Sequence, residues 1–229
     1  MKIWQRALYF AGLPIAVVTA AVLHQPPPPE AAPYHLTKRD AAGQVIAPWS
    51  GPWSCVCDNS SGLLWEVKTD DEGIHDGLWT YSWYLANPPG FHTAARTERA
   101  EPLPEVGVPD NGDCYFEETR CDTEDLIRRT NQQKLCGENN WRLPTAAELA
   151  TLVYPQAKAG QAKIDTDYFP HTKRGDYWTG DEGEALPDVY RYLHRGAEAI
   201  SFVDGEQFTI PHRNAAFVRL VSADSNSCH

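Results

Sequence analysis

Cysteine is the residue type whose chemistry stands out first in this sequence. The chain has six cysteines, at positions 55, 57, 114, 121, 136 and 228. Thiols either join in disulfides or bind zinc as thiolates. The spacings Cys55 to Cys57 and Cys114 to Cys121 do not give two C-x-x-C knuckles. The sequence therefore favours disulfides over a zinc site.

Carboxylates that could bind a hard cation gather in two short stretches. The first comprises Asp70, Asp71, Glu72 and Asp76. The second comprises Asp181, Glu182, Glu184 and Asp188. The spacing of the first does not match an EF-hand loop, and a solvated acidic turn is the favoured interpretation. The second is the candidate metal site, with Ca²⁺ as the one cofactor considered.

Rings and charged donors that could hold a sugar lie near the second acidic stretch. They are His171, Arg174, Tyr177, Trp178 and Arg191. Rings stack on sugars, and charged donors fix the orientation of a ligand. The alternative is that Tyr177 and Trp178 belong to a buried strand, and the sequence leaves both interpretations open.

The sequence gives little evidence for a catalytic site. No G-x-S-x-G elbow is present, and reactive free thiols are not expected when the cysteines pair. A pair of glycosidase carboxylates cannot be recognised without knowing their separation. We therefore expect a binding protein rather than an enzyme, with no catalytic residue assigned.

The segment Trp141-Arg142-Leu143-Pro144-Thr145, followed by Glu148, is interpreted as structural. Thr145 and Glu148 have the spacing of a capping box, in which the two side chains bind backbone amides at a helix start. Trp141 and Leu143 would pack in the core, and Arg142 would act as a hydrogen-bonding strut.

Hydrophobic patterning predicts a mixed fold. One helix is expected over residues 123–135, capped by Asp122, and a second begins at Thr145. Strands are expected at 63–68, 80–85, 176–179, 189–194, 199–203, 207–210 and 215–221, with Asp204-Gly205 as a hairpin turn. Residues 86–113 are expected to form a long loop. These elements indicate the α+β class.

The N-terminal part of the chain differs from the rest. Residues 1–23 carry Lys2 and Arg6 ahead of an apolar run, which indicates a cleaved signal peptide in preference to an uncleaved membrane anchor. Residues 24–48 contain a run of prolines and indicate an extended linker. The domain itself is expected over residues 49–229, in the periplasm or at the cell surface. Only the N-terminal segment is expected to meet a membrane.

An ordered set of motifs resembles one known family. The motifs include Trp53-Ser-Cys55-Val, Leu63-Leu64-Trp65-Glu66, Tyr81-Ser82-Trp83-Tyr84, Cys121-Asp122-Thr123, Cys136-Gly137, Trp141-Arg142-Leu143-Pro144-Thr145, Tyr177-Trp178 and Val218-Arg219-Leu220-Val221. Together they resemble the Lcl C-terminal domain family, named for the C-terminal domain of a collagen-like bacterial adhesin. The resemblance covers about residues 53–221.

The resemblance implies a C-type-lectin-like fold: two helices packed on a twisted antiparallel sheet with long loops, stapled by disulfides. It also supports the pairs Cys55–Cys136 and Cys114–Cys121. Cys57 and Cys228 are additions to the family pattern, and are expected to pair with each other. In lectin-like folds the variable ligand loops include the region of Asp181 to Asp188, which is where a ligand or metal is expected.

Charge and family together suggest the kind of partner. The adhesin of this family binds sulfated polysaccharides as a trimer, but this chain has a net charge of -11 and no collagen-like stalk. Such a charge opposes binding to nucleic acid and to other polyanions. We expect an extracytoplasmic binding or adhesion module for a glycan or protein ligand. The alternatives are an assembly component of the cell envelope, or a hydrolase or oxidase on the same fold.

Overall fold

The computed structural model describes residues 35–85, 106–114, 121–186, 188–193, 195–223 and 228, without the side chains of Asp188 and Arg191. The chain divides into two compact units, residues 1–34 and 35–229. The signal or anchor at residues 1–23 and the first part of the linker lie outside the described residues and stay predictions. Among the helices that are described, none is long and apolar enough to cross a bilayer.

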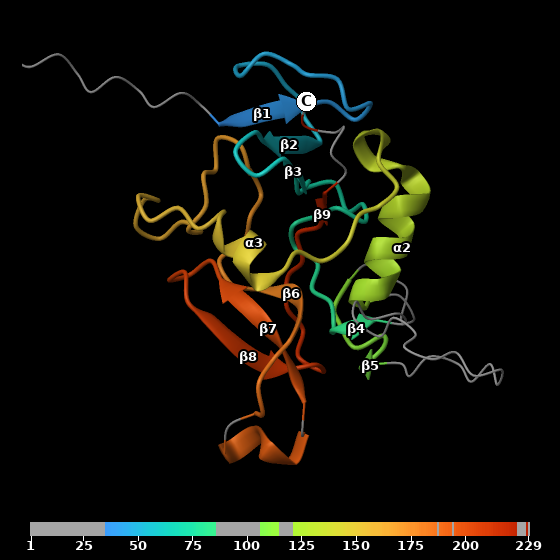
Figure 1. Cartoon of the computed structure of the whole chain (residues 1–229), viewed down its shortest axis with the longest axis vertical. Helices are drawn as coiled ribbons and strands as arrows, with labels where there is room; N and C mark the ends of the chain where they lie inside the picture. The colour runs from blue at the N-terminus through green and yellow to red at the C-terminus, as the bar shows by residue number, and fades with distance from the viewer. Residues whose placement is uncertain are drawn as a thin grey trace, which may run out of the picture. The chain divides into compact units, whose positions relative to one another are not determined.

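One antiparallel sheet joins the first strands of the described chain to the last. It contains β1 (Leu36–Arg39), β2 (Cys55–Asp58), β3 (Leu63–Glu66) and β9 (Val221–Ser222), in the order β1-β2-β3-β9. All residues of β2, β3 and β9 are buried. The edge strands of this sheet are β1 and β9, and β1 lies at one end of the unit (Figure 1).

Strand β1 lies inside residues 24–48, which the sequence assigned to an extended linker. It pairs with β2 along its whole length, from Leu36 opposite Asp58 to Arg39 opposite Cys55. Leu36 is its only apolar residue, so hydrophobic patterning gave no strand signal. Backbone hydrogen bonding to the edge of β2 forms the strand instead. The folded unit accordingly begins before Trp49.

A second antiparallel sheet carries the loops that were expected to bind a ligand. It consists of β6 (Asp176–Glu182), β7 (Gly196–Ser201) and β8 (Gln207–Pro211). The hairpin between β7 and β8 turns at Asp204-Gly205 as predicted, and Gly205 has a φ of 90°, which suits glycine. A short two-stranded ladder, β4 (Tyr84–Leu85) with β5 (Val106–Gly107), stands in place of the longer strand expected at 80–85.

The first predicted helix is confirmed, with an earlier end than expected. Helix α2 spans Thr123–Gln133, and the Asp122 side chain accepts a hydrogen bond from the Asp125 amide, as expected for its cap. The helix ends because Lys134 adopts the left-handed conformation at φ 52°. A 3-10 turn, η1 (Leu135–Gly137), then brings Cys136 to its disulfide partner.

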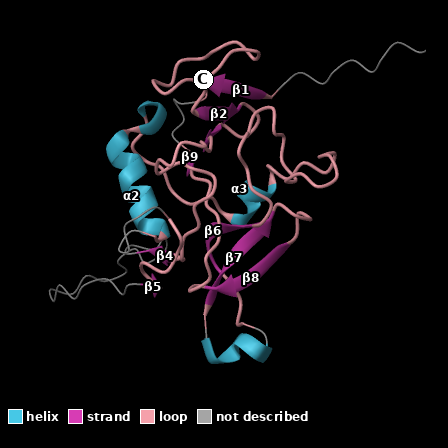
Figure 2. Ribbon diagram, turned by 180° about the vertical axis from the view of Figure 1, so that it is seen from behind, coloured by secondary structure: helices cyan, strands magenta, loops and turns pink. Residues whose placement is uncertain are grey.

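The second predicted helix forms as a short element, α3 (Ala146–Ala150), beside β6 and β7 (Figure 2). Both halves of the capping box are present between Thr145 and Glu148. Arg142 makes two hydrogen bonds of 2.8 Å to the Glu148 carboxylate, and Trp141 and Leu143 are buried. The segment from Trp141 to Glu148 therefore has the structural role that the sequence predicted. With these helices beside antiparallel strands, the α+β class is confirmed.

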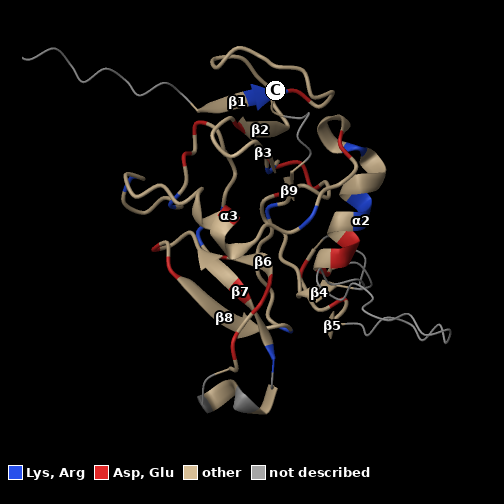
Figure 3. Cartoon of the chain, viewed as in Figure 1, with Lys and Arg blue, Asp and Glu red and all other residues tan. Residues whose placement is uncertain are grey.

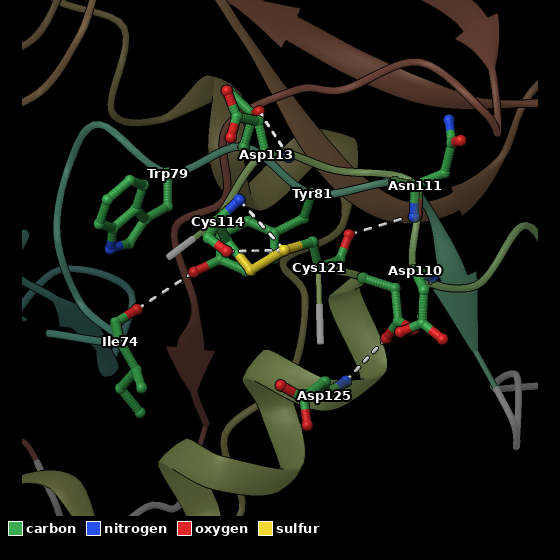
Figure 4. Close-up of a disulfide and its surroundings, with 12 residues drawn as sticks. Ile74, Trp79, Tyr81, Asp110, Asn111, Asp113, Cys114, Cys121 and Asp125 are labelled. Atoms are coloured by element: carbon green, nitrogen blue, oxygen red, sulfur yellow. Dashed lines mark hydrogen bonds between the residues drawn. A yellow bond between two sulfur atoms is a disulfide. The ribbon is translucent and has the colours of Figure 1, made fainter. Parts of the chain in front are cut away.

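All three predicted disulfides are present: Cys55–Cys136, Cys57–Cys228 and Cys114–Cys121. The first joins Cys55 of β2 to η1. The second joins Cys57 of β2 to Cys228, close to the chain's end. The third lies at the start of α2, next to Tyr81 and Asp113 (Figure 4). Its sulfur on Cys121 accepts a hydrogen bond from the Cys114 amide at 3.1 Å. The cross-links thus converge on β2 and on both ends of α2.

Large rings fill the core. Trp65, Trp83, Trp141 and Trp178 are each no more than 2% exposed. One cluster of buried residues contains all six cysteines together with Trp83, Trp141 and Trp178. A second surrounds Trp65, Phe169 and Phe202. These large rings therefore stabilise the interior.

Candidate ligand-binding site

The loop between β6 and β7 carries a 3-10 helix, η2 (Asp188–Leu193), that projects away from the sheets (Figure 1). The sequence predicted a strand at residues 189–194, and that prediction is wrong. The alternation of Val189, Tyr190 and Tyr192 with other residues suits a strand only when a partner strand is available. Here the segment is not one of the three strands of the β6-β7-β8 sheet and turns as a 3-10 helix instead.

Helix η2 exposes large side chains to solvent. Val189 is 72% exposed, Tyr190 46% and Tyr192 69%. Phe208, on the edge strand β8, is 36% exposed. The described side chains of η2 carry no charge, whereas acidic residues lie at the end of β6 (Figure 3). We call Val189, Tyr190 and Tyr192 the aromatic tip. Clustered exposed rings of this kind mark interaction surfaces.

The base of the tip is fixed to the sheet. Leu186 is buried, with 5% of its surface exposed. The Gly183 amide donates to the carbonyl of Gly196 at 3.0 Å. Glu182 and Arg195 form an exposed ion pair of 3.5 Å across the two strands, which contributes little to stability. The sheet therefore holds both ends of the loop close together while η2 stays solvated.

The residues expected to bind a ligand differ in their exposure to solvent. His171 and Arg174 are exposed, in the turn that precedes β6. Tyr177 and Trp178 are 1% and 0% exposed, so of the two interpretations left open by the sequence, the structure supports a buried strand rather than rings available for stacking. The side chain of Arg191 lies outside the description. His171 and Arg174 stay candidates, and the exposed rings of η2 replace the two buried ones.

Burial of Tyr177 and Trp178 follows from the position of β6 between two packed layers. The Tyr177 ring meets Phe202 edge-on, with 4.8 Å between ring centroids, and its hydroxyl donates to the carbonyl of Lys173 at 3.2 Å. Burial raises the pKa of Tyr177 to about 12. Trp178 donates from its ring nitrogen to the Tyr81 carbonyl at 2.6 Å. Successive strand residues point to opposite faces, and here both faces are covered.

One comparison with known proteins matches the sequence of this chain. The family model of the Lcl C-terminal domain matches residues 54–222. The chain belongs to this family. No curated protein and no solved structure gives a significant match.

The acidic stretch of this Lcl C-terminal domain is divided among separate partners. An Asp181 carboxylate oxygen accepts a hydrogen bond from the Ala146 amide at the start of α3, at 2.7 Å. Glu182 pairs with Arg195, Glu184 is exposed, and the Asp188 side chain lies outside the description. Within the described ranges, no group of three metal-ligating side chains is found. Calcium binding stays a prediction.

The sequence did not reveal the most unusual feature of the Lcl C-terminal domain, a buried charged network. Glu66 and Arg219 are 0% exposed and Lys68 is 3% exposed. The Glu66 carboxylate accepts hydrogen bonds from Lys68 at 2.8 Å and from His75 at 2.7 Å. Its other oxygen accepts from the Leu220 amide at 2.9 Å.

Arg219 completes this network from the segment that leads into β9. Its guanidinium donates to the Glu66 carbonyl and, at 2.7 Å, to the Thr172 hydroxyl, and it lies 4.9 Å from the Phe169 ring centroid. The signal in the sequence was a charged residue inside each of two apolar runs, around Glu66 and Arg219. Because these groups are sealed from solvent, the network links strands rather than contacting a ligand.

Proposed function

We propose that this protein is an extracytoplasmic adhesion module of C-type-lectin-like fold, which contacts its ligand through the aromatic tip. The observation that carries the proposal is the exposure of Val189, Tyr190 and Tyr192 on one short projecting helix. Membership of a family named for an adhesin domain supports it. Three disulfides also suit a protein that works in an oxidising compartment.

The position of the tip favours a role in reaching a surface. Within the second unit, β1 and η2 lie at opposite ends (Figures 1 and 2). The chain enters this unit at the β1 end, so a tether attached there leaves the tip facing outward.

The exposed tyrosines and the net charge favour a glycan or a protein surface as the ligand. Tyrosine offers a flat ring for stacking on sugars and a hydroxyl for hydrogen bonding. The same residue is enriched at the centre of protein interfaces. The net charge of -11 opposes sulfated or phosphorylated polymers. Neutral or amine-bearing glycans and basic protein surfaces are therefore the favoured ligands.

Binding of purified residues 35–229 to a glycan array and to immobilised surface proteins tests the proposal. We expect Tyr190→Ser with Tyr192→Ser to weaken binding at least about tenfold, since truncation of a central interface ring costs about 2 kcal/mol or more. Trp49→Ser is the matched control, because Trp49 is 87% exposed and belongs to the loop after β1, away from the tip.

Equal binding by the tyrosine variant and the wild type would rule out the tip as the contact surface. The same arrays run with calcium and with a chelator decide the calcium prediction, since a bound ion that organises the loop makes binding chelator-sensitive.

A further inference from the structure

A second group of rings, at the far end of the unit from the tip, surrounds a lysine of the chain itself. Lys38 lies on β1 and is only 7% exposed. Its ammonium nitrogen is 3.5 Å from the centroid of the Trp53 ring and 5.3 Å from that of Tyr168. Ammonium groups are attracted to the faces of aromatic rings, most strongly when water is excluded.

The walls around the ammonium are built without Lys38. The Trp53 ring nitrogen donates to the Tyr168 carbonyl at 2.8 Å, which fixes one ring against the segment that carries the other. The Tyr168 amide donates to the Asp165 carbonyl at 3.2 Å, and the Asp167 amide donates to the Asp165 carboxylate at 3.0 Å. These contacts belong to the body of the unit, so the cage should persist when Lys38 is shortened.

The electrostatics of the cage suit a cation without a direct carboxylate partner. Burial lowers the pKa of Lys38, while the nearby carboxylates of Asp167 and Asp165 act in the opposite direction. Within the described part of the chain, no carboxylate lies within 4.0 Å of the ammonium nitrogen. Ring faces and more distant charges thus hold the ammonium group, an arrangement that also accepts methylated ammonium groups.

The occupant is attached through an edge strand. β1 has β2 as its one neighbouring strand in the sheet and is four residues long; its other side makes a single bridge, between Arg39 and Val45, with the Ile46 amide donating to the Lys38 carbonyl at 3.1 Å. Edge strands of this length are among the elements that open first in a folded domain. Lys38 is therefore carried by a short edge strand, whereas Trp53 and Tyr168 lie on segments outside β1 and are joined to each other by a hydrogen bond.

We infer that Trp53, Tyr168, Asp165 and Asp167 form an alkylammonium-binding cage, with Lys38 as its built-in occupant. A primary or methylated ammonium on an unbranched alkyl chain, such as a lysine side chain of another protein, takes the same place when β1 withdraws. The cage is independent of the aromatic tip, and it makes the N-terminal strand a competitor for cationic ligands.

Chemical rescue tests this inference. Lys38→Ala removes the ammonium and leaves the rings. We expect n-butylammonium at about 50 mM to raise the thermal midpoint of this variant by about 4 °C, through binding to the folded state. Two controls should show a change in thermal midpoint of less than about 1 °C when n-butylammonium is added. One is the wild type, whose cage is filled. The other is Lys134→Ala, which removes an exposed lysine.

Two further measurements test whether the rescue needs the charge of the ligand and the Trp53 ring. 1-Butanol at the same concentration has a similar alkyl chain without the charge, and it should give no comparable shift. Trp53→Leu combined with Lys38→Ala should abolish the rescue. If Lys38→Ala does not fold, Lys38→Gly and Lys38→Ser are tested in the same way, with refolding scored with and without n-butylammonium. Equal effects of the amine and the alcohol, or no effect of either, would overturn the inference.

Discussion

Replacing Glu66 by glutamine will lower the free energy of unfolding by about 3–5 kcal/mol, the usual cost of removing one partner from a buried ion pair. The variant keeps the shape of the side chain but leaves Lys68 and Arg219 as buried cations without their anion. Burial already lowers the pKa of Lys68, and Glu66 is the largest influence opposing that shift. Denaturant unfolding with the disulfides intact measures the loss.

The control for this change is Glu206→Gln, which alters an exposed glutamate in the turn after β7. A surface substitution of this kind should change stability by less than about 0.5 kcal/mol. If Glu66→Gln were no more destabilising than the control, the buried network would not contribute to the fold.

The same network predicts how stability depends on pH. Burial alone would raise the pKa of Glu66, but the Lys68 ammonium and the hydrogen bond from His75 outweigh it and hold the pKa at about 2. A glutamate in the unfolded chain has a pKa of about 4.3. Because the folded value is lower, this stabilisation is complete above about pH 5 and is lost as the pH falls toward 2. Wild type and Glu66→Gln should therefore converge in stability in acid.

Removing the Cys57–Cys228 disulfide with paired alanine substitutions should cost more stability than removing Cys114–Cys121. The first bond joins residues 171 apart and the second residues only 7 apart. Constraint of the unfolded chain gives upper values of about 5 and about 2.5 kcal/mol for these two bonds. Cys55–Cys136, with a separation of 81, should fall between them, at about 4.5 kcal/mol.

Unfolding of the three paired alanine variants in the same denaturant gives the ranking directly. The reverse order would show that the cross-links act mainly on the folded state, through the local packing of each cysteine, instead of restricting the unfolded chain.

Local chemistry explains which features could be predicted from the sequence. The disulfide pairs, the Thr145–Glu148 capping box and the Asp204-Gly205 turn depend on a few residue types at fixed spacing, or on the family pattern, and all three are confirmed. Whether Tyr177 and Trp178 are both buried depends on whether one or both faces of β6 are covered. Hydrophobic periodicity along the sequence does not show this. Strand β1 could not be predicted, because it forms by backbone pairing and its side chains show no hydrophobic pattern.

The exposed helix η2 and the buried network were missed for related reasons. An alternating run such as Val189 to Leu193 forms a strand only beside a free strand edge, and the order of strands in a sheet is a tertiary property. Glu66 and Arg219 are 153 positions apart, so neither identifies its partner along the chain. Charged residues within apolar runs were the available signal, and they indicate burial without indicating what they contact.

Hydrogen exchange of residues 35–229, read by mass spectrometry, tests most directly whether a cross-linked scaffold displays an unpacked aromatic tip. With the disulfides intact, we expect slow exchange in β2, β3, β7 and α2, and rapid exchange in residues 188–193. Reduction should remove the protection of the sheets and leave the tip unchanged. Strong protection of residues 188–193 in the oxidised protein, equal to that of β7, would contradict the account.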